Sequence, residues 1–169
     1  MLIDEKEEDV KGVETVSSSN GRARLLGSLL REPYRKYVSG EPYVIGLTGM
    51  LASGKSSVCK RLEGLGAYKV DADKLGHLAY APKTAEREQG PAYEQVIEHF
   101  GRDILAEDGI TIDRKKLGGK VFNNPGERRK LEEIVWPAIE LLCRREIGKA
   151  AEAGHKVVCV EGEDRGTPE

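Results

Sequence analysis

The sequence predicts an α/β fold in which a parallel sheet is flanked by helices. Tyr43-Val-Ile-Gly-Leu47 is apolar on both faces, as is typical of a strand buried within a parallel sheet. A glycine-rich turn, a segment with helical apolar spacing and a second short apolar run follow, and this succession indicates a strand–helix–strand unit. A third apolar run, at residues 156–160, predicts another buried strand.

The helix of this unit is expected to begin inside the glycine-rich turn. Its apolar side chains recur at helical spacing, at Val58, Leu62 and Leu65. Gly64 and Gly66 favour its end, because glycine tolerates the backbone conformation that follows helices. The second strand is then expected at residues 67–70.

Residues 74–154 are predicted to be mostly helical. Pro91 suits a first helical position, because its missing N–H is not needed there, and Gly101 suits the end of that helix. Asp113 is expected to cap a further helix over residues 114–121, since a short carboxylate can accept from the first free amides.

A long helix is expected from Pro125, with Asn124 as its cap. Its apolar residues are Leu131, Ile134, Val135, Ala138, Leu142 and Ile147. Pro137 lies inside this run and lacks an N–H, so it is expected to kink or split the helix, which Gly154 ends.

Composition narrows the classes of partner. The 169 residues carry 27 Lys and Arg against 29 Asp and Glu, a net charge of −2, which is no footprint for a nucleic acid. The sequence contains no run of 18 apolar residues, so no membrane span is predicted.

Three cysteines lie far apart in the sequence, at Cys59, Cys143 and Cys159. They support neither a zinc site nor a disulfide framework, and free thiols fit a reducing compartment. A cytoplasmic protein is expected, with a mitochondrial location as the alternative.

The chain divides into three parts. Residues 1–40 are expected to form a polar linker and a short amphipathic helix, residues 41–160 the folded domain, and residues 161–169 a polar tail. Leucines in residues 21–31 recur on one face and predict either a helix that caps the domain or one that docks on a partner protein.

The strongest motif is G-x-x-x-x-G-K-S, from Gly49 to Ser56. Glycines let the backbone fold into a nest of amides around phosphate, and the following helix adds its positive end. Lys55 would reach the β- and γ-phosphates, and the Ser56 hydroxyl would ligate Mg²⁺. The motif predicts a P-loop because it follows a buried strand and precedes an amphipathic helix. Its ATP-binding residues are Gly49, Met50, Leu51, Ala52, Ser53, Gly54, Lys55, Ser56 and Ser57.

Two carboxylates follow the second strand, at Asp71 and Asp73. Ligands of open parallel sheets bind at the carboxyl ends of the strands, where carboxylates can take a hydroxyl proton or hold Mg²⁺. The two side chains share one side if the strand continues through them. A turn or a helix cap built from Asp is the alternative.

In this order, GLTGMLASGKSSV, LGAYKVDADKLGH, AYEQVIEHFG, DGITIDRKKLG and WPAI resemble the dephospho-coenzyme A kinase family, from about Tyr43 to Val160. The resemblance implies a P-loop kinase-like fold with strand order 2-3-1-4-5, and ATP-dependent phosphorylation of the ribose 3′-hydroxyl of dephospho-coenzyme A. It implies ATP and Mg²⁺ as cofactors. It also implies two catalytic residues, Asp73 as the general base and Lys55. The substrate-binding residues that it implies are Asp71, Asp73, His77 and Arg114. Residues 17–34 resemble the linker helix of animal bifunctional coenzyme A synthase, whose adenylyltransferase domain would lie upstream.

The chain departs from that family in two places. Met50-Leu51-Ala52 stand where the family loop is richer in glycine. After residue 160, the family's lid arginines and last two strands have no counterpart, so the sheet is expected to be incomplete at the C-terminus, with the P-loop strand at an open edge and the chain a truncated form. A non-catalytic fragment that binds nucleotide weakly, or a protein through residues 21–31 or the open edge, is the main alternative; a relative of nucleoside monophosphate kinases is another.

Overall fold

A computed structural model describes residues 41–49 and 52–162, and the predicted amphipathic helix in residues 21–31 lies outside the described residues. In this described part of the chain, three parallel strands form one sheet: β1 (Tyr43–Leu47), β2 (Tyr68–Asp71) and β3 (Val157–Glu161). Their order is β1-β3-β2. This confirms the predicted parallel sheet and the predicted order of its first three strands. Within the described part of the chain, β1 pairs only with β3.

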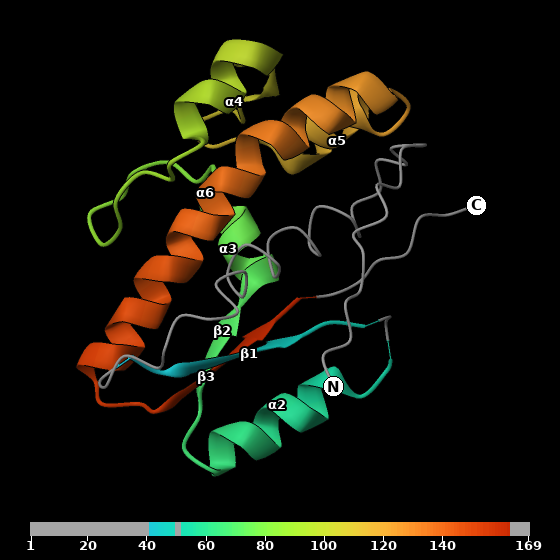
Figure 1. Cartoon of the computed structure of the whole chain (residues 1–169). Coiled ribbons are helices and arrows are strands. Elements are labelled where there is room, and N and C mark those ends of the chain that lie inside the picture. Colours follow the sequence, from blue (N-terminus) through green and yellow to red (C-terminus); the bar gives the residue numbers. More distant parts are fainter. Residues whose placement is uncertain (1–40, 50–51, 163–169) are drawn as a thin grey trace, which may run out of the picture.

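Helices cover both faces of this sheet (Figure 1). The helix α2 (Lys55–Gly64) connects β1 to β2 on one face. The connection from β2 back to β3 contains α3 (Ala72–Leu78), α4 (Tyr93–Phe100), η1 (Arg102–Ile104), α5 (Arg114–Val121) and α6 (Pro125–Glu152). The connection from β1 to β2 crosses the sheet in one direction, and the connection from β2 to β3 crosses it in the other. Because both crossovers between parallel strands are right-handed, their helices lie on opposite faces of the sheet.

Local caps formed as the sequence indicated. The Asp113 carboxylate accepts from the amides of Lys115 and Lys116 at the start of α5, and Asn124 accepts from the first amides of α6. The helix α6 continues through Pro137, so the split that this proline predicted did not occur. The helix α4 begins two residues after Pro91, which therefore is not in its first turn.

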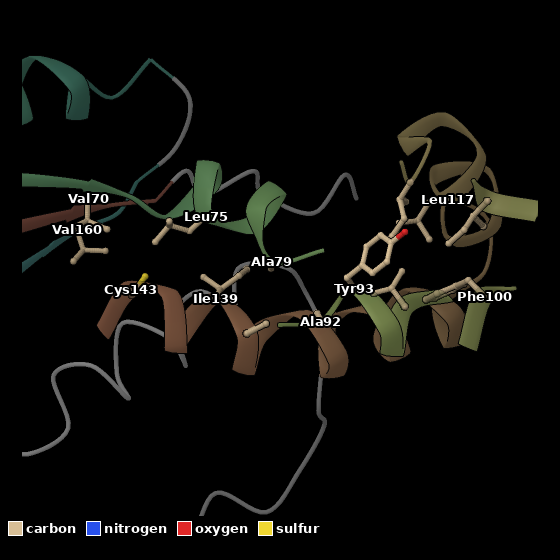
Figure 2. Packing of buried hydrophobic residues seen from close by; sticks show 14 of the residues in the cluster. Val70, Leu75, Ala79, Ala92, Tyr93, Phe100, Leu117, Ile139, Cys143 and Val160 are labelled. Carbon is tan, nitrogen blue, oxygen red and sulfur yellow. The ribbon is translucent and has the colours of Figure 1, made fainter. Parts of the chain in front are cut away.

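The apolar core lies between one face of the sheet and the helices α3 and α6 that cover this face (Figure 2). Val70, Val158 and Val160 point from the strands into this core, where Leu75 of α3 and Ile139 of α6 meet them. Tyr93 and Phe100 extend the same cluster toward α4 and α5 (Figure 2). Since side chains alternate along a strand, the residues between these valines face α2 instead. No helix among the described residues has the length and apolar character needed to cross a membrane.

Candidate active site

The glycine loop joins the carboxyl end of β1 to the first turn of α2 (Figure 1). Gly54 is the N-cap of α2, with a left-handed φ of 83°, a conformation that costs a residue with a Cβ roughly 1–2 kcal/mol. The helix therefore begins at Lys55, inside the loop, as predicted. Met50 and Leu51 lie outside the described residues.

Lys55 lies across the loop that precedes it. Its side chain is buried, with the residue only 8% exposed. The ammonium Nζ donates to the carbonyl oxygen of Gly49 at 2.6 Å and approaches the Ser53 hydroxyl at 3.5 Å. A cation is thus held among the backbone groups of the loop, where it can neutralise a bound polyanion.

Ser56 connects the loop to the third strand. Its hydroxyl donates to Oε1 of Glu161 at 2.9 Å, and the second oxygen of this carboxylate forms an ion pair with Lys69 at 2.6 Å. Lys69, followed by the Ser56 hydrogen bond, holds the pKa of the Glu161 carboxyl below its ordinary value, although burial acts the other way. Glu161 in turn raises the pKa of Lys69. The carboxylate therefore stays ionised at neutral pH beside the loop.

Asp71 and Asp73 do not lie on one strand. β2 ends at Asp71, and α3 begins at Ala72. Asp71 caps α3, where its carboxylate accepts from the amide of Lys74 at 3.0 Å, so the cap alternative is correct for this residue. Asp73 lies in the first turn of α3, because that cap turns the chain into a helix before a further strand residue can form.

His77 and Arg114 both lie on helices of the long connection. His77 is exposed, one helical turn after Asp73, and this spacing places the two on one face of α3. Arg114 is the exposed first residue of α5, which runs beside the first turns of α6, away from the sheet (Figure 1).

The three cysteines are free thiols, and the structure buries all of them. Cys59 of α2 and Cys159 of β3 pack together with their sulfur atoms 3.3 Å apart. Burial, and then the neighbouring Cys159, raise the pKa of Cys59 to about 12, and burial raises that of Cys143 to about 12. These two thiols are therefore protonated at neutral pH and act as packing groups.

Glu161 and Lys69 are the two site residues that the sequence analysis missed. Glu161 was assigned to a polar tail, but it is the last residue of β3 and only 8% exposed. The available signal was an acidic residue at the end of an apolar run, the place where parallel strands present their ligands. Lys69 gave a weaker signal, a lone charge within a short apolar strand.

The arrangement fits a magnesium ion. No group of three or more His, Cys, Asp or Glu able to hold a metal occurs in the part of the chain that the structure describes. Mg²⁺ in phosphate-binding sites needs no such cage, since it keeps waters and phosphate oxygens and takes one or two protein ligands. Because the Ser56 hydroxyl donates its hydrogen to Glu161, the lone pairs of its oxygen are available to a cation.

A parallel sheet with a glycine loop after its first strand, a buried lysine and an acidic end of β3 defines a P-loop kinase fold. Residues 43–161 match the family model of dephospho-CoA kinase, so the chain belongs to that family.

Curated relatives and solved structures agree. A dephospho-CoA kinase of Anaeromyxobacter dehalogenans is 45% identical over 112 residues, 66% of this chain and 50% of that protein. One of Geobacter metallireducens is 49% identical over 107 residues, 63% of this chain and 50% of that protein. The dephospho-CoA kinase from Campylobacter jejuni has a TM-score of 0.53 at 26% identity, covering 71% of this chain and 56% of that one. The chain thus spans about half the length of these relatives.

Proposed function

We propose that this chain binds MgATP through its glycine loop and phosphorylates the ribose 3′-hydroxyl of dephospho-CoA, the last step of coenzyme A biosynthesis. The observation that carries this proposal is the Lys55–Ser56 pair. Both residues lie at the start of a helix capped by a left-handed glycine, and Ser56 is tied to a buried carboxylate. The family to which the chain belongs points to the acceptor.

Phosphoryl transfer needs positioning and neutralisation of charge more than covalent help from the protein. Loop amides and the Lys55 ammonium would hold the phosphates and offset charge on the group in transfer. Mg²⁺, held at Ser56, supplies a further positive charge to the phosphate oxygens when bound. Ser57 follows Ser56 in the first turn of α2 and completes the phosphate-binding segment.

The acceptor side is assigned to α3 and α5. Asp73 would orient the ribose hydroxyl and accept its proton as the new bond forms, because a carboxylate is a suitable base for a hydroxyl in line with phosphate. His77 lies on the same face of α3 one turn later, and Arg114 is exposed at the start of α5. These two side chains would contact the coenzyme, with Asp71 as the cap that sets the position of Asp73.

The direct test is a coupled assay of the purified chain. ADP release that depends on added dephospho-CoA supports the proposal, and Lys55→Met should reduce it by at least about 100-fold, the scale of one lost charge contact in a transition state. Arg61→Met, on an exposed turn of the same helix, is the matched control. ADP release that is equal with and without dephospho-CoA contradicts the acceptor assignment.

A non-catalytic nucleotide-binding chain is the second candidate. Tyr43, Val58 and Leu65 are exposed at 64%, 45% and 85%, and β1 pairs on one side only within residues 41–49 and 52–162. An unpaired edge strand beside apolar side chains can add a strand from another chain. Lys55-dependent ATP binding without turnover, in a purified chain that forms complexes, would favour this candidate. A mononucleotide acceptor in the same assay tests a nucleoside monophosphate kinase.

The finer assignment is to the kinase domain of the bifunctional animal type. Its support is the resemblance of residues 17–34 to the linker helix of that enzyme. A transcript that encodes an adenylyltransferase domain in frame before residue 17 is the expected observation. A transcript in which an unrelated reading frame precedes this segment contradicts it.

A further inference from the structure

Three residues from three different elements form one connected set beside the loop, which we call the loop triad: Ser56 of α2, Glu161 of β3 and Lys69 of β2. The lysine lies outside the phosphate-binding motif and reaches the site from the neighbouring strand. Lys69 pairs in register with Cys159 and Asp71 with Glu161, so Lys69 and Glu161 are diagonal neighbours on the same face of the sheet.

Each oxygen of the Glu161 carboxylate has a separate partner. Oε1 accepts from the Ser56 hydroxyl at 2.9 Å, and Oε2 contacts the Lys69 ammonium at 2.6 Å. The side chains of Lys69 and Glu161 are 25% and 11% exposed, so water competes little for the carboxylate. With Oε2 occupied by the lysine, Oε1 remains the acceptor for Ser56.

This division of oxygens decides where the Ser56 hydrogen points. A hydroxyl has one hydrogen and two lone pairs, and the hydrogen rotates to the best acceptor. While it points to Glu161, both lone pairs remain free for a cation. Without Lys69, the carboxylate could rotate and place either oxygen, or neither, against the hydroxyl.

We infer that Lys69 is a positioning residue for the magnesium–nucleotide site, acting through Glu161 on the orientation of the Ser56 hydroxyl. This inference rests on the proposed function only in taking a magnesium-bound nucleotide as the ligand. Lys69 contacts neither metal nor phosphate in this scheme. Its effect should therefore appear in how much Mg²⁺ strengthens nucleotide binding, and not in binding without metal.

The structure supplies a matched control with the same chemistry elsewhere, which we call the helix triad: Tyr68, Glu146 and Lys149. The Tyr68 hydroxyl donates to one oxygen of Glu146 at 3.0 Å, and Lys149 contacts the other at 2.6 Å. Tyr68 is the first residue of β2, at the amino end of the sheet, away from the loop. Lys149→Met therefore removes the same kind of ion pair at a distance from the site.

The experiment titrates the complete chain with a fluorescent ADP analogue, once with excess Mg²⁺ and once with EDTA. The dissociation constant in EDTA divided by that in Mg²⁺ measures how much the metal strengthens nucleotide binding. Measuring this ratio requires no turnover. Lys69→Met should lower this ratio about tenfold, the lower end for residues that orient a metal ligand. Lys69→Arg should restore most of it, because it keeps a charged donor, and Lys149→Met should leave it unchanged.

Binding in EDTA serves as the folding control, because it needs an intact loop but no metal. If Lys69→Met fails to fold, Lys69→Gln takes its place, since it keeps a neutral donor of shorter reach. An unchanged ratio in Lys69→Met, or in the Lys69→Gln variant used in its place, overturns the inference if that variant still binds in EDTA. So does a wild-type chain whose nucleotide affinity does not respond to Mg²⁺. A wild-type chain without dephospho-CoA-dependent turnover, by contrast, overturns the proposed function. The effect of Lys69→Met on the ratio can still be measured in that case, and it tests the inference separately.

Discussion

The two triads make the same contacts in very different surroundings. Both place a carboxylate between a hydroxyl and a lysine, and both ion pairs measure 2.6 Å. The helix triad pairs Glu146 with Lys149 three residues later on α6, with side chains 25% and 65% exposed. The loop triad joins three elements, and its Glu161 and Lys69 side chains are 11% and 25% exposed.

This difference shows what contact geometry alone does not reveal. A pair at i, i+3 forms wherever the helix forms, and because water reaches most of the Lys149 side chain, the pair adds little stability. The loop triad exists only when β2, β3 and α2 have assembled, and its charges are shielded from solvent. Removing one charge should therefore be costly in the loop triad and nearly neutral in the helix triad.

The largest expected effect comes from Glu161→Gln. This change leaves the largely buried Lys69 ammonium without its charged partner and should destabilise the chain by about 2–3 kcal/mol. Glu146→Gln, the matched change in the helix triad, should cost less than about 1 kcal/mol. Urea unfolding of both variants measures the difference; equal losses would mean that burial does not distinguish the two triads.

Lowering the pH should reduce the stabilising effect of Glu161 more than that of Glu146. Lys69 depresses the pKa of Glu161 in the folded state, so its stabilising effect is present above the ordinary carboxyl pKa and is lost as pH falls through the folded value. The gap in melting temperature between wild type and Glu161→Gln should then narrow from about pH 6 to pH 3. Lys149 and Tyr68 also lower the pKa of Glu146, in a more exposed place. The gap for Glu146→Gln should narrow less.

Tyr68→Phe should have a smaller effect, about 0.5–1.5 kcal/mol, because it removes one hydrogen bond from a carboxylate that water can still reach. The Tyr68 hydroxyl has a raised pKa, first because of this hydrogen bond to Glu146. Nucleotide binding, with or without Mg²⁺, should remain as in the wild type. Equilibrium unfolding and the fluorescent titration check both statements, and a change in magnesium dependence would contradict the separation of the two triads.

The sequence predicted features that depend on neighbouring residues better than contacts between elements far apart in the chain. The caps Asp113 and Asn124, the start of α2 and the first strand follow from local rules, because capping and periodicity act between near neighbours. The loop motif was likewise local, and it placed Lys55 and Ser56 at the start of the helix.

What sequence reasoning missed depends on long-range pairing. Glu161 contacts a residue 105 positions earlier, and its register against Asp71 is set by the sheet. Its position after the last apolar residue was equally compatible with a tail, so the strand end could not be placed by pattern alone. For Asp71 and Asp73 the deciding feature was local. The sequence analysis left open whether the strand continues or Asp71 caps a helix, and the structure shows the cap, which ends the strand before Asp73.

The smallest effect should come from Lys149→Met, which removes a lysine whose side chain is 65% exposed. Its loss should change the free energy of unfolding by no more than about 0.5 kcal/mol, because water replaces most of what the ammonium supplied. Lys69→Met, with the same change of side chain and the same ion-pair distance, should cost clearly more, since Glu161 then loses its charged partner while its side chain is only 11% exposed. Urea unfolding of the two variants side by side measures this difference in cost. If Lys149→Met proved as costly as Lys69→Met, the stability of both triads would have to come from the ion pair itself and not from the fold around it.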